Sequence, residues 1–313
     1  MLTSCPNTTV LTLSSSADRQ TGSKQCDLVL VTSVAIRILF PDQADHTCPL
    51  RITVSPCDGD RDILDLSGTR FAKPFGITLL YGLISFLRQQ GGLVHLTAPS
   101  PLVATYLWRM NLHLPFAGDD SLTFEPDITR WGVSRPPPET VFPLTCIRVE
   151  NDDEVVEAGG RLWDIISARA PQFVPAADQI RTALVELISN VERHSRAGMA
   201  TVVAQTHKDA VRLAVGDVGI GVRRSLQGAY PLAGRPDQDV LKFATQPGVT
   251  ATPGGGGTGL WTIVDAIQEY GRAVHLGSGQ GVYSVFRRYE QARPSGILIP
   301  GTIVEVAFGR PKT

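Results

Sequence analysis

The sequence predicts a mixed α/β protein built from two domains. The chain has 313 residues, and a domain usually contains roughly 100 to 200 residues. In the first half, short apolar runs alternate with amphipathic helical patterns, which is typical of a parallel α/β unit. A proline-containing stretch over 117–149 includes Pro136-Pro137-Pro138, and consecutive prolines favour extended backbone over helix. We therefore expect a flexible tail over 1–24, an α/β domain over 25–116, a linker over 117–149 and a second α/β domain over 150–313.

The first domain is expected to alternate strands with two helices. Short β-branched or apolar runs bounded by Asp, Pro and Gly predict strands over 28–31, 34–40, 50–54 and 62–66. An apolar-faced helix is expected over 75–89, ending at Gly91-Gly92, because glycine is the usual residue after a helix C-terminus. A strand over 93–96 and a helix over 100–112 follow.

The second domain is expected to begin with two helices, over 153–170 and 176–195, followed by strands over 200–205 and 211–215. The stretch 222–258 contains many Gly and Pro residues and only one short helical pattern, near 237–245. A connection of that length is usually a functional lid or a disordered segment. A helix over 260–270 and strands over 273–276, 282–287 and 302–308 are expected to complete the domain.

Charge and hydropathy exclude several classes of protein. Lys and Arg number 29, Asp and Glu number 30, and the formal net charge is −1, so no nucleic-acid partner is expected. The longest apolar stretch, 75–87, contains two glycines and is shorter than the roughly 18 residues of a membrane-spanning helix. The N-terminus has no basic region followed by an apolar core, so no secretory signal is expected. These observations predict a cytoplasmic protein without a membrane partner.

The five cysteines are an odd number, widely spaced, with no CxxC pair and no histidine at ligand spacing. We expect reduced thiols rather than a disulfide framework or a zinc site.

The window 183–195, ALVELISNVERHS, carries two kinds of periodicity. At 100° per residue it places an apolar stripe on one face, and on another face it aligns Glu186, Asn190 and His194 at i, i+4 and i+8. The stripe consists of Leu184, Leu187, Ile188 and Val191. Taken alone, the polar face fits ordinary solvated side chains as well as a site.

Two glycine-containing segments follow. Asp217 lies at the end of a predicted strand and precedes Gly219 and Gly221, which allow a tight turn beside a ligand. The glycine run in 253–259 leads into a helix near Leu260, and a glycine loop at a helix N-terminus suits a phosphate group. No lysine follows this loop, which excludes a P-loop, and its GxGxxG match lacks the preceding strand of a dinucleotide-binding fold.

In order along residues 150–310, the segments ELISNVERHS, DVGIG, GGGGTGLW and Gly301-Thr302 resemble the GHKL ATPase family, which includes gyrase, Hsp90, histidine kinases, MutL and anti-sigma-factor kinases. The resemblance implies a Bergerat α/β sandwich that binds ATP and Mg²⁺. It assigns Mg²⁺ binding to Asn190 and an acid or base role to Glu186. It assigns adenine recognition to Asp217, with Thr302 nearby. The further cofactor-binding positions that it implies are His194, Gly219, Gly221, Gly255, Gly257, Thr258, Gly259 and Leu260. For His194 the resemblance leaves open a phosphate contact or a place at the pocket edge without chemical duty.

The segment 63–112 resembles the STAS domain of anti-sigma-factor antagonists, with a strand, a turn, a helix beginning at Gly76, a second strand and a second helix. That family carries a phosphorylatable serine just before the glycine, whereas this chain has Lys73-Pro74-Phe75-Gly76. Phosphorylation at that position is therefore not expected, and the STAS-like domain is interpreted as a docking surface.

Together the two resemblances predict a regulatory protein similar to anti-sigma-factor serine/threonine kinases, which couples ATP binding or hydrolysis to a protein partner, with Glu186 as base. The alternative is a nucleotide-gated interaction module without phosphotransfer. Histidine autophosphorylation is not expected, because the nearest upstream histidine, His113, precedes Leu114-Pro115 and the proline-rich stretch. The identity of the partner and the formation of a homodimer stay open.

Overall fold

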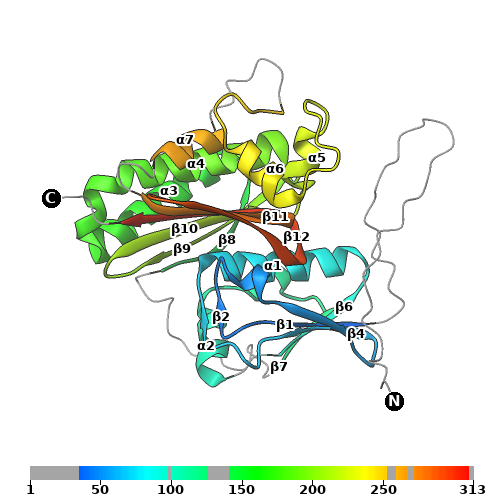
Figure 1. Cartoon of the computed structure of the whole chain (residues 1–313). Helices are drawn as coiled ribbons and strands as arrows, with labels where there is room; N and C mark the ends of the chain where they lie inside the picture. Colours follow the sequence, from blue (N-terminus) through cyan, green and yellow to red (C-terminus); the bar gives the residue numbers. More distant parts are fainter. Residues whose placement is uncertain (1–34, 98–99, 126–140, 252–258, 267–270, 310–313) are drawn as a thin grey trace.

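The computed structural model describes residues 35–97, 100–125, 141–251, 259–266 and 271–309. These residues form a mixed α/β structure, which confirms the predicted class. Figure 1 shows its layers: helices cover one side of an upper sheet, and helix α1 separates this sheet from a lower one. The expected tail over 1–24 and the expected strand over 28–31 lie outside the described residues. No helix among the described residues combines the length and the apolar character that crossing a membrane requires.

The lower sheet has five strands in the order β3-β1-β4-β6-β7. Strand β1 pairs parallel with β4, β4 with β6 and β6 with β7, and β3 pairs antiparallel with β1 at one edge. The predicted parallel unit is thus confirmed, with one antiparallel edge strand added. The strands are β1 (Ile36–Leu39), β3 (Thr53–Pro56), β4 (Arg61–Asp65), β6 (Leu93–Thr97) and β7 (Leu122–Glu125). A separate parallel pair consists of β2 (Gln43–Ala44) and β5 (Phe71–Ala72).

Helix α1 (Pro74–Gln89) has the boundaries that its sequence predicts. Proline occupies its first turn, where the missing N–H has no helical partner to lose. At its C-terminus Gly91 has a positive φ of 80°, Gly92 N–H donates to Leu87 O at 3.0 Å and Gly91 N–H to Arg88 O at 2.9 Å. This hydrogen-bond pair is the Schellman motif. Helix α2 (Pro101–Arg109) is capped at its N-terminus by Ser100, whose hydroxyl oxygen accepts a hydrogen bond from Val103 N–H at 3.3 Å.

The upper sheet has five antiparallel strands in the order β11-β12-β10-β9-β8. Its longest strands form the hairpin β11–β12. Two separate strands were expected over 273–276 and 282–287, and this expectation is wrong: β11 runs through both, because register shifts around Gly279 and Gly281 absorb the irregularity without ending the pairing. The strands are β8 (Val141–Arg148), β9 (Met199–Thr206), β10 (Ala210–Asp217), β11 (Gly271–Phe286) and β12 (Glu290–Gly309).

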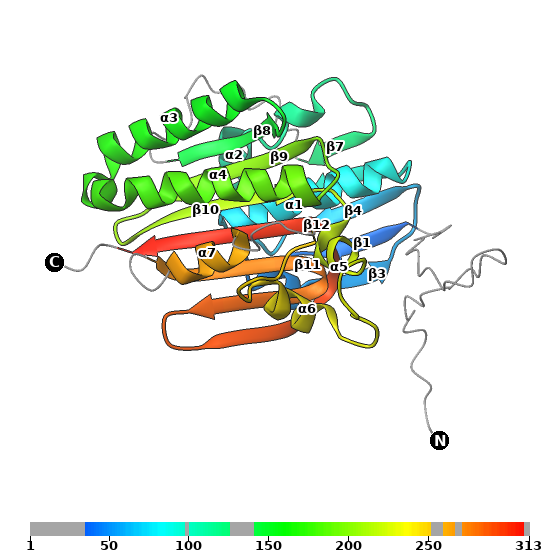
Figure 2. The ribbon, with the colours of Figure 1, turned by 90° about the horizontal axis from the view of Figure 1, so that it is seen from above.

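Figure 2 shows α3, α4 and α7 lying across the upper sheet, with α5 and α6 at one end. Helix α3 (Asp152–Arg169) is capped by Asn151, whose side chain accepts from the Asp153 and Glu154 N–H groups. The bounds of the others are α4 (Ala177–His194), α5 (Gly221–Leu226), α6 (Asp237–Ala244) and α7 (Gly259–Ala266), and residues 267–270 of the helix expected over 260–270 lie outside the described residues.

The expected proline-containing linker over 117–149 contains two strands in its described part. Strand β7 extends the lower sheet and β8 extends the upper sheet. Pro143 falls within β8, where it is tolerated because β8 is an edge strand and its register shifts between Phe142 and Thr145. Leu144 N–H also donates to Met110 O at 3.0 Å, which ties this strand to the first half of the chain.

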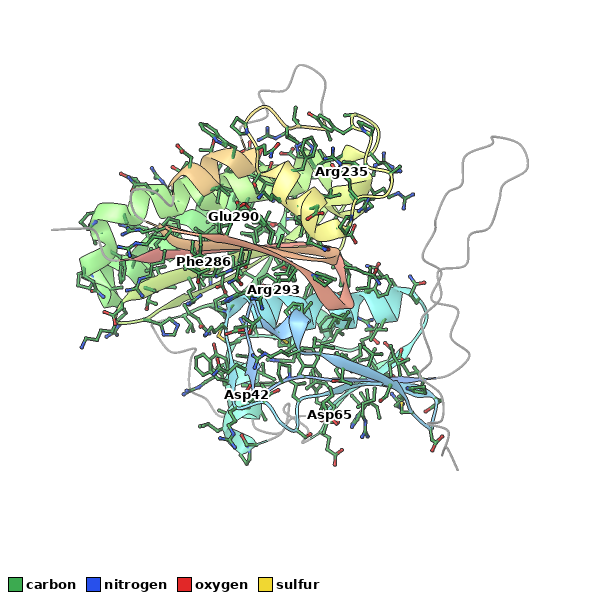
Figure 3. The ribbon with its side chains drawn as sticks, viewed as in Figure 1. Asp42, Asp65, Arg235, Phe286, Glu290 and Arg293 are labelled. Carbon is green, nitrogen blue, oxygen red and sulfur yellow. The ribbon has the colours of Figure 1, made fainter. Side chains whose placement is uncertain are left out.

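The expected lid over 222–258 is folded up to Ala251, the last residue described before 259. Helices α5 and α6 enclose a small apolar core of Leu226, Leu232, Val240 and Ala244. The Phe243 ring packs edge-on against Tyr230 at 5.0 Å between centroids. The guanidinium of Arg235, labelled in Figure 3, lies over the Phe243 ring, 5.3 Å from its centroid. These contacts stabilise the segment 222–251, although its Gly and Pro content predicts an irregular structure.

Helix α1 lies between the two sheets, which explains why eleven of its sixteen residues are buried. Phe75 is fully buried, and one core cluster combines α1 and the lower sheet with Leu144, Val203 and Ile303 of the upper sheet. At the contact with β10, a Cβ on Gly216 would come within 2.4 Å of Thr78 Cγ2. The first core therefore crosses the boundary that was expected between two domains.

Candidate functional site

The candidate site lies on the helix-covered face of the upper sheet. In α4 the apolar stripe of the sequence is buried: Leu184, Leu187, Ile188 and Val191 face the sheet core. The neighbouring polar face carries Glu186, Asn190 and His194, all partly buried. Side chains alternate along a strand, and on β12 this puts Thr302 on the α4 side and Glu305 on the α1 side, where Glu305 accepts from Phe75 N–H.

Asp217 is the last residue of β10 and is directly paired in register with Thr302 of β12. The family resemblance assigns both residues to the neighbourhood of adenine, and in the fold they are neighbours across this strand pair. Asp217 is 7% exposed, and Gly219 N–H donates to its Oδ1 at 2.7 Å. Burial raises the pKa of Asp217 to about 6, although the backbone hydrogen bonds of Gly219 and Thr302 oppose the rise.

The glycines around Asp217 are required by close backbone approach. A Cβ on Gly219 would lie 2.1 Å from Ser195 O, and the next residue, Ile220, donates its N–H to that same oxygen at 2.9 Å. Gly301 has a φ of 62°, and a Cβ there would lie 2.2 Å from Asp217 O and 2.6 Å from its Oδ1. Glycine at these positions thus lets the Asp217 turn pack against both the end of α4 and the turn before Thr302.

Six of the predicted residues line one cavity of about 180 Å³. They come from α4, the end of β10, the start of α5, α7 and β12, which are far apart in sequence. The six are Asn190, His194, Asp217, Gly221, Leu260 and Thr302. The walls are otherwise mainly apolar, with Leu187, Val215, Val222, Leu226 and Val304 among them. A mostly apolar cavity with a few convergent polar groups is the usual form of a small-molecule site.

Asn190 presents an unused polar group to this cavity. Its Nδ2 is buried and has no hydrogen-bond partner among the described residues. Buried polar groups are normally paired, because leaving one unpaired costs about 1 to 3 kcal/mol. An unpaired amide N–H group fits a hydrogen bond to an acceptor on a ligand, whereas an ion would be bound through the amide oxygen.

Three other predicted residues, Glu186, Gly219 and Gly259, are not among those that line this cavity. Glu186 is not among its lining residues; its Oε1 lies 3.7 Å from Arg193 Nη2. Gly219 lines a neighbouring cavity of about 750 Å³ between α1, α5 and α6, which shares Gly221 with the first. Gly259 is the first residue of α7, one position before Leu260.

The remaining predicted residues, Gly255, Gly257 and Thr258, lie outside the described residues. His194 is described, and burial, with a smaller contribution from Arg193, lowers its pKa below 6.5. The lowered pKa favours the neutral imidazole, although the charge of Glu186 opposes the shift.

The sequence reasoning missed four polar or charged lining residues: Arg193, Ser195, Ser225 and Thr250. Arg193 was detectable, because it follows Asn190 by three residues and so lies on the same helix face. Ser225 and Thr250 were not, because only the fold of the α5–α6 segment brings them to the cavity.

Another side-chain cluster, on the opposite face of the sheet, contains residue types that can bind a metal ion. Among the described residues, His46, His275 and Glu305 bring their potential ligand atoms within 4.8 Å of one another. The two imidazole rings are stacked at 3.5 Å with 9° between their planes, so their lone pairs lie in separate, nearly parallel planes, which does not suit coordination of one ion by both rings. Glu305 already accepts from Arg212. This geometry fits a buried polar contact between layers better than an ion.

Comparisons with known proteins add no family assignment. No protein-family model matches the chain, and a search of curated proteins finds no significant match.

Proposed function

We propose that the chain is an ATP- and Mg²⁺-binding regulatory protein similar to the GHKL anti-sigma-factor serine/threonine kinases, with a STAS-like first half. The observation that carries the proposal is the convergence of Asn190, Asp217, Leu260 and Thr302 on one cavity. The sequence motifs place these residues in four separate segments, and nothing in their spacing along the chain requires that they meet.

The adenine end of the proposed ligand is assigned to Asp217 and Thr302. Above pH 6 the Asp217 carboxylate accepts a hydrogen bond from an exocyclic amine, which adenine has at the position where guanine carries a carbonyl. The apolar side chains of Val215, Val222 and Val304 suit the faces of a purine. Asp217 is held by Gly219 N–H, so its orientation is fixed before a ligand arrives.

The phosphate end is assigned to the side of the cavity lined by Asn190 and Leu260, next to the start of α7. Asn190 fits Mg²⁺ coordination, since an amide oxygen is a suitable ligand for a hard cation that phosphate oxygens also bind. When bound, Mg²⁺ would neutralise phosphate charge and orient the terminal group. Among the described residues lining the cavity, Asn190 is the amide available for this role.

Glu186 is the proposed general base for a kinase or ATPase reaction. It lies one helical turn before Asn190 on the same face of α4 and accepts a proton from the attacking hydroxyl or water. A positioned general base contributes roughly 10²- to 10⁴-fold to a rate. The partner, in this proposal, is a protein that supplies the hydroxyl or responds to the nucleotide state.

A second function, a nucleotide-gated interaction module without phosphotransfer, is favoured by one observation. Glu186 is not among the residues that line the cavity, and its carboxylate is paired with Arg193 at 3.7 Å.

Incubation with ATP labelled on its terminal phosphate, with and without host extract, separates the two. Label in free phosphate or on a second protein, reduced roughly 10²- to 10⁴-fold by Glu186→Ala while ATP stays bound, supports the enzyme. Asn190→Ala should lose both binding and turnover. ATP binding without any hydrolysis or transfer favours the module, and absence of ATP binding contradicts both functions.

A further inference from the structure

The second cavity, of about 750 Å³, lies where the two halves of the chain meet, outside the cavity proposed for the nucleotide. Its lining comes from the end of α1, the turn after Asp217, α5, α6 and the β11–β12 hairpin. Figure 1 shows α5 and α6 above this end of the upper sheet and α1 below it. Small-molecule sites have volumes of roughly 300 to 1,000 Å³. The second cavity is therefore large enough to hold a ligand of its own.

The turn after Asp217 forms a wall between the two cavities. Gly221 and Val222 line both of them. Ser278 fixes this wall, because its hydroxyl donates to Gly301 O at 2.6 Å and accepts from Val222 N–H at 3.1 Å. A Cβ on Gly221 would lie 2.8 Å from Ser278 Oγ, so the turn packs closely against β11. Ligands in the two cavities would be separated by this turn.

Much of the second cavity is lined by apolar side chains from both halves of the chain. They include Phe86 from α1, Leu298 and Pro300 from β12, Ile220 before α5 and Val240 from α6. Phe86 and Leu298 are partly exposed, so apolar surface is open to a ligand. Removal of apolar surface from water is the dominant favourable contribution to most association. The lining therefore suits a ligand with an apolar body.

Arg223 and Arg224 both line the second cavity, but only one of them is available to a ligand. Arg223 Nε donates to Asp237 Oδ1 at 2.5 Å, its Nη1 donates to Leu232 O at 3.1 Å, and its Nη2 donates to Arg235 O. Arg224 is exposed and forms no hydrogen bond or ion pair with any residue that the structure describes. Two arginines against one aspartate leave the described lining with a net charge of +1.

A single available guanidinium matches a ligand group with one negative charge. A carboxylate carries that charge, and its two oxygens can accept two guanidinium N–H groups side by side. Gln89 and Gln227 also line the cavity and are exposed, so their amides offer further N–H donors. A phosphate group with a second charge would find no second free cation among the described lining residues.

We infer that the second cavity binds a small monocarboxylate with an apolar body. Arg224 holds the carboxylate, and Phe86 and Leu298 contact the apolar body. This site goes beyond the proposed function, and its occupation does not require a nucleotide.

Titration calorimetry on the full chain without nucleotide tests the site, with octanoate and octan-1-ol as charged and uncharged probes. We expect Arg224→Ala to weaken octanoate binding about five- to tenfold, because a charge-assisted hydrogen bond is lost, and to leave octan-1-ol binding unchanged. Arg181→Ala is the matched control. Arg181 is exposed on α4, is paired with Asp178 at 3.5 Å and lines neither cavity, so both affinities should stay unchanged.

The apolar contact is tested by Leu298→Ala. This variant should weaken octanoate and octan-1-ol binding equally, by about threefold or more, because the two probes share the same apolar chain. Leu298 is partly exposed, and near-ultraviolet circular dichroism checks that the variant keeps its packing. Unchanged affinity for both probes in a folded Leu298→Ala variant would overturn the placement of the ligand.

Saturating ATP with Mg²⁺ distinguishes the second cavity from the first. Octanoate should still bind when ATP is present, because the two cavities are separate. Mutually exclusive binding would show one shared site and overturn the inference. Absence of octanoate binding, or equal losses in Arg224→Ala and Arg181→Ala, would overturn it too. If the chain binds octanoate but not ATP, the proposed function fails and this inference stands.

Discussion

Two buried carboxylates on neighbouring strands of the upper sheet have opposite surroundings. Glu305, on the α1 face, is fully buried and accepts from Arg212 Nη1 at 2.6 Å and from Phe75 N–H at 3.0 Å. Asp217, on the α4 face, is 7% exposed and forms no ion pair with the described residues. Burial raises the pKa of both groups. Glu305 is paired with a cation inside the protein, whereas Asp217 accepts backbone hydrogen bonds and lines a cavity.

The comparison separates a structural carboxylate from a candidate binding carboxylate. A buried charge that is paired inside the protein stabilises one arrangement of the layers, and its removal is felt as instability. A buried charge without a cationic partner is unfavourable in the folded state, so it persists where a ligand uses it. Glu305 substitutions should therefore affect folding, and Asp217 substitutions should affect binding.

The largest expected effect is on stability, from breaking the pair on the α1 face. Arg212→Ala leaves Glu305 buried without its cation and should lower the free energy of unfolding by about 3 to 5 kcal/mol, measured by urea denaturation. The double variant Arg212→Met, Glu305→Gln should recover part of this loss, because no charge is then left unpaired. The control Arg181→Ala removes an exposed pair and should change the free energy by less than about 1 kcal/mol. If Arg212→Ala also lowers the free energy of unfolding by less than about 1 kcal/mol, the packing of the layers does not depend on this ion pair.

The next largest effect is a loss of folding stability at acid pH, caused by His46, which stacks on His275 of the upper sheet. The pKa of His46 is lowered to about 4, first by burial and then by nearby cations. The charged groups that act on His46 are Asp45, Arg51, Lys73 and Arg212, and His275 stacks on it. Since the unfolded chain binds the proton near pH 6.5 and the folded chain does not, stability should fall as pH drops from 6.5 toward 4. We expect about 2 to 3 kcal/mol from His46 over that range.

The variant His46→Phe keeps a ring for stacking and removes the titration. Urea denaturation at pH 7 and at pH 4.5 should therefore show a smaller loss of stability in His46→Phe than in the unmodified chain. An equal loss in both proteins would assign the acid sensitivity to other groups.

Asp217 predicts a smaller effect in binding. Its folded-state pKa is raised to about 6, so its charged form, and with it the acceptor for the adenine amine, is lost as pH falls below 6. ATP affinity should decrease by up to about tenfold per pH unit there. The same raised pKa makes folding more favourable toward low pH, opposite in sign to His46. Calorimetric titrations at pH 7.5 and pH 5 check this, with Asp217→Asn expected to show a flatter profile.

The last prediction is the absence of an effect: we expect no phosphorylation of Thr69 or Thr78. Thr69 and Thr78 are each 2% exposed, and their hydroxyls donate to Pro41 O at 3.0 Å and to Pro74 O at 2.9 Å. A phosphate on either would have to enter the packed layer around α1. Mass spectrometry after incubation with ATP should find no phosphate on any residue from Thr69 to Thr78. A stoichiometric modification there would contradict the packing of α1.

The sequence predicts those elements whose signals are local. Helix α1 could be predicted because its apolar run ends at Gly91-Gly92, and α4 because its stripe repeats every 3.6 residues. Strand β8 was missed because Pro143 argues against a strand, and only its edge position and register shift make proline acceptable. The burial of α1 between two sheets was also missed, since an apolar helix indicates burial but not its neighbours.

In the candidate site, too, local sequence signals could be recognised, whereas contacts that depend on packing could not. Asn190, Asp217 and Thr302 could be singled out because motif order is visible in the chain. The pairing of Glu186 with Arg193, and the approach of Ser225 and Thr250 to the cavity, depend on side-chain direction and on the folding of the α5–α6 segment. These are properties of packing, which no local pattern encodes.

The central claim is that the cavity around Asp217 is a site for an adenine nucleotide. Titration of the full chain with ATP and with GTP, in the presence of Mg²⁺, tests it most directly when Asp217→Ala is measured beside the unmodified protein. The account predicts that the unmodified chain prefers ATP and that Asp217→Ala loses about tenfold or more in ATP affinity. It also predicts little change in affinity for GTP. An unchanged preference for ATP over GTP in the variant would contradict the assignment of Asp217 and of the site built around it.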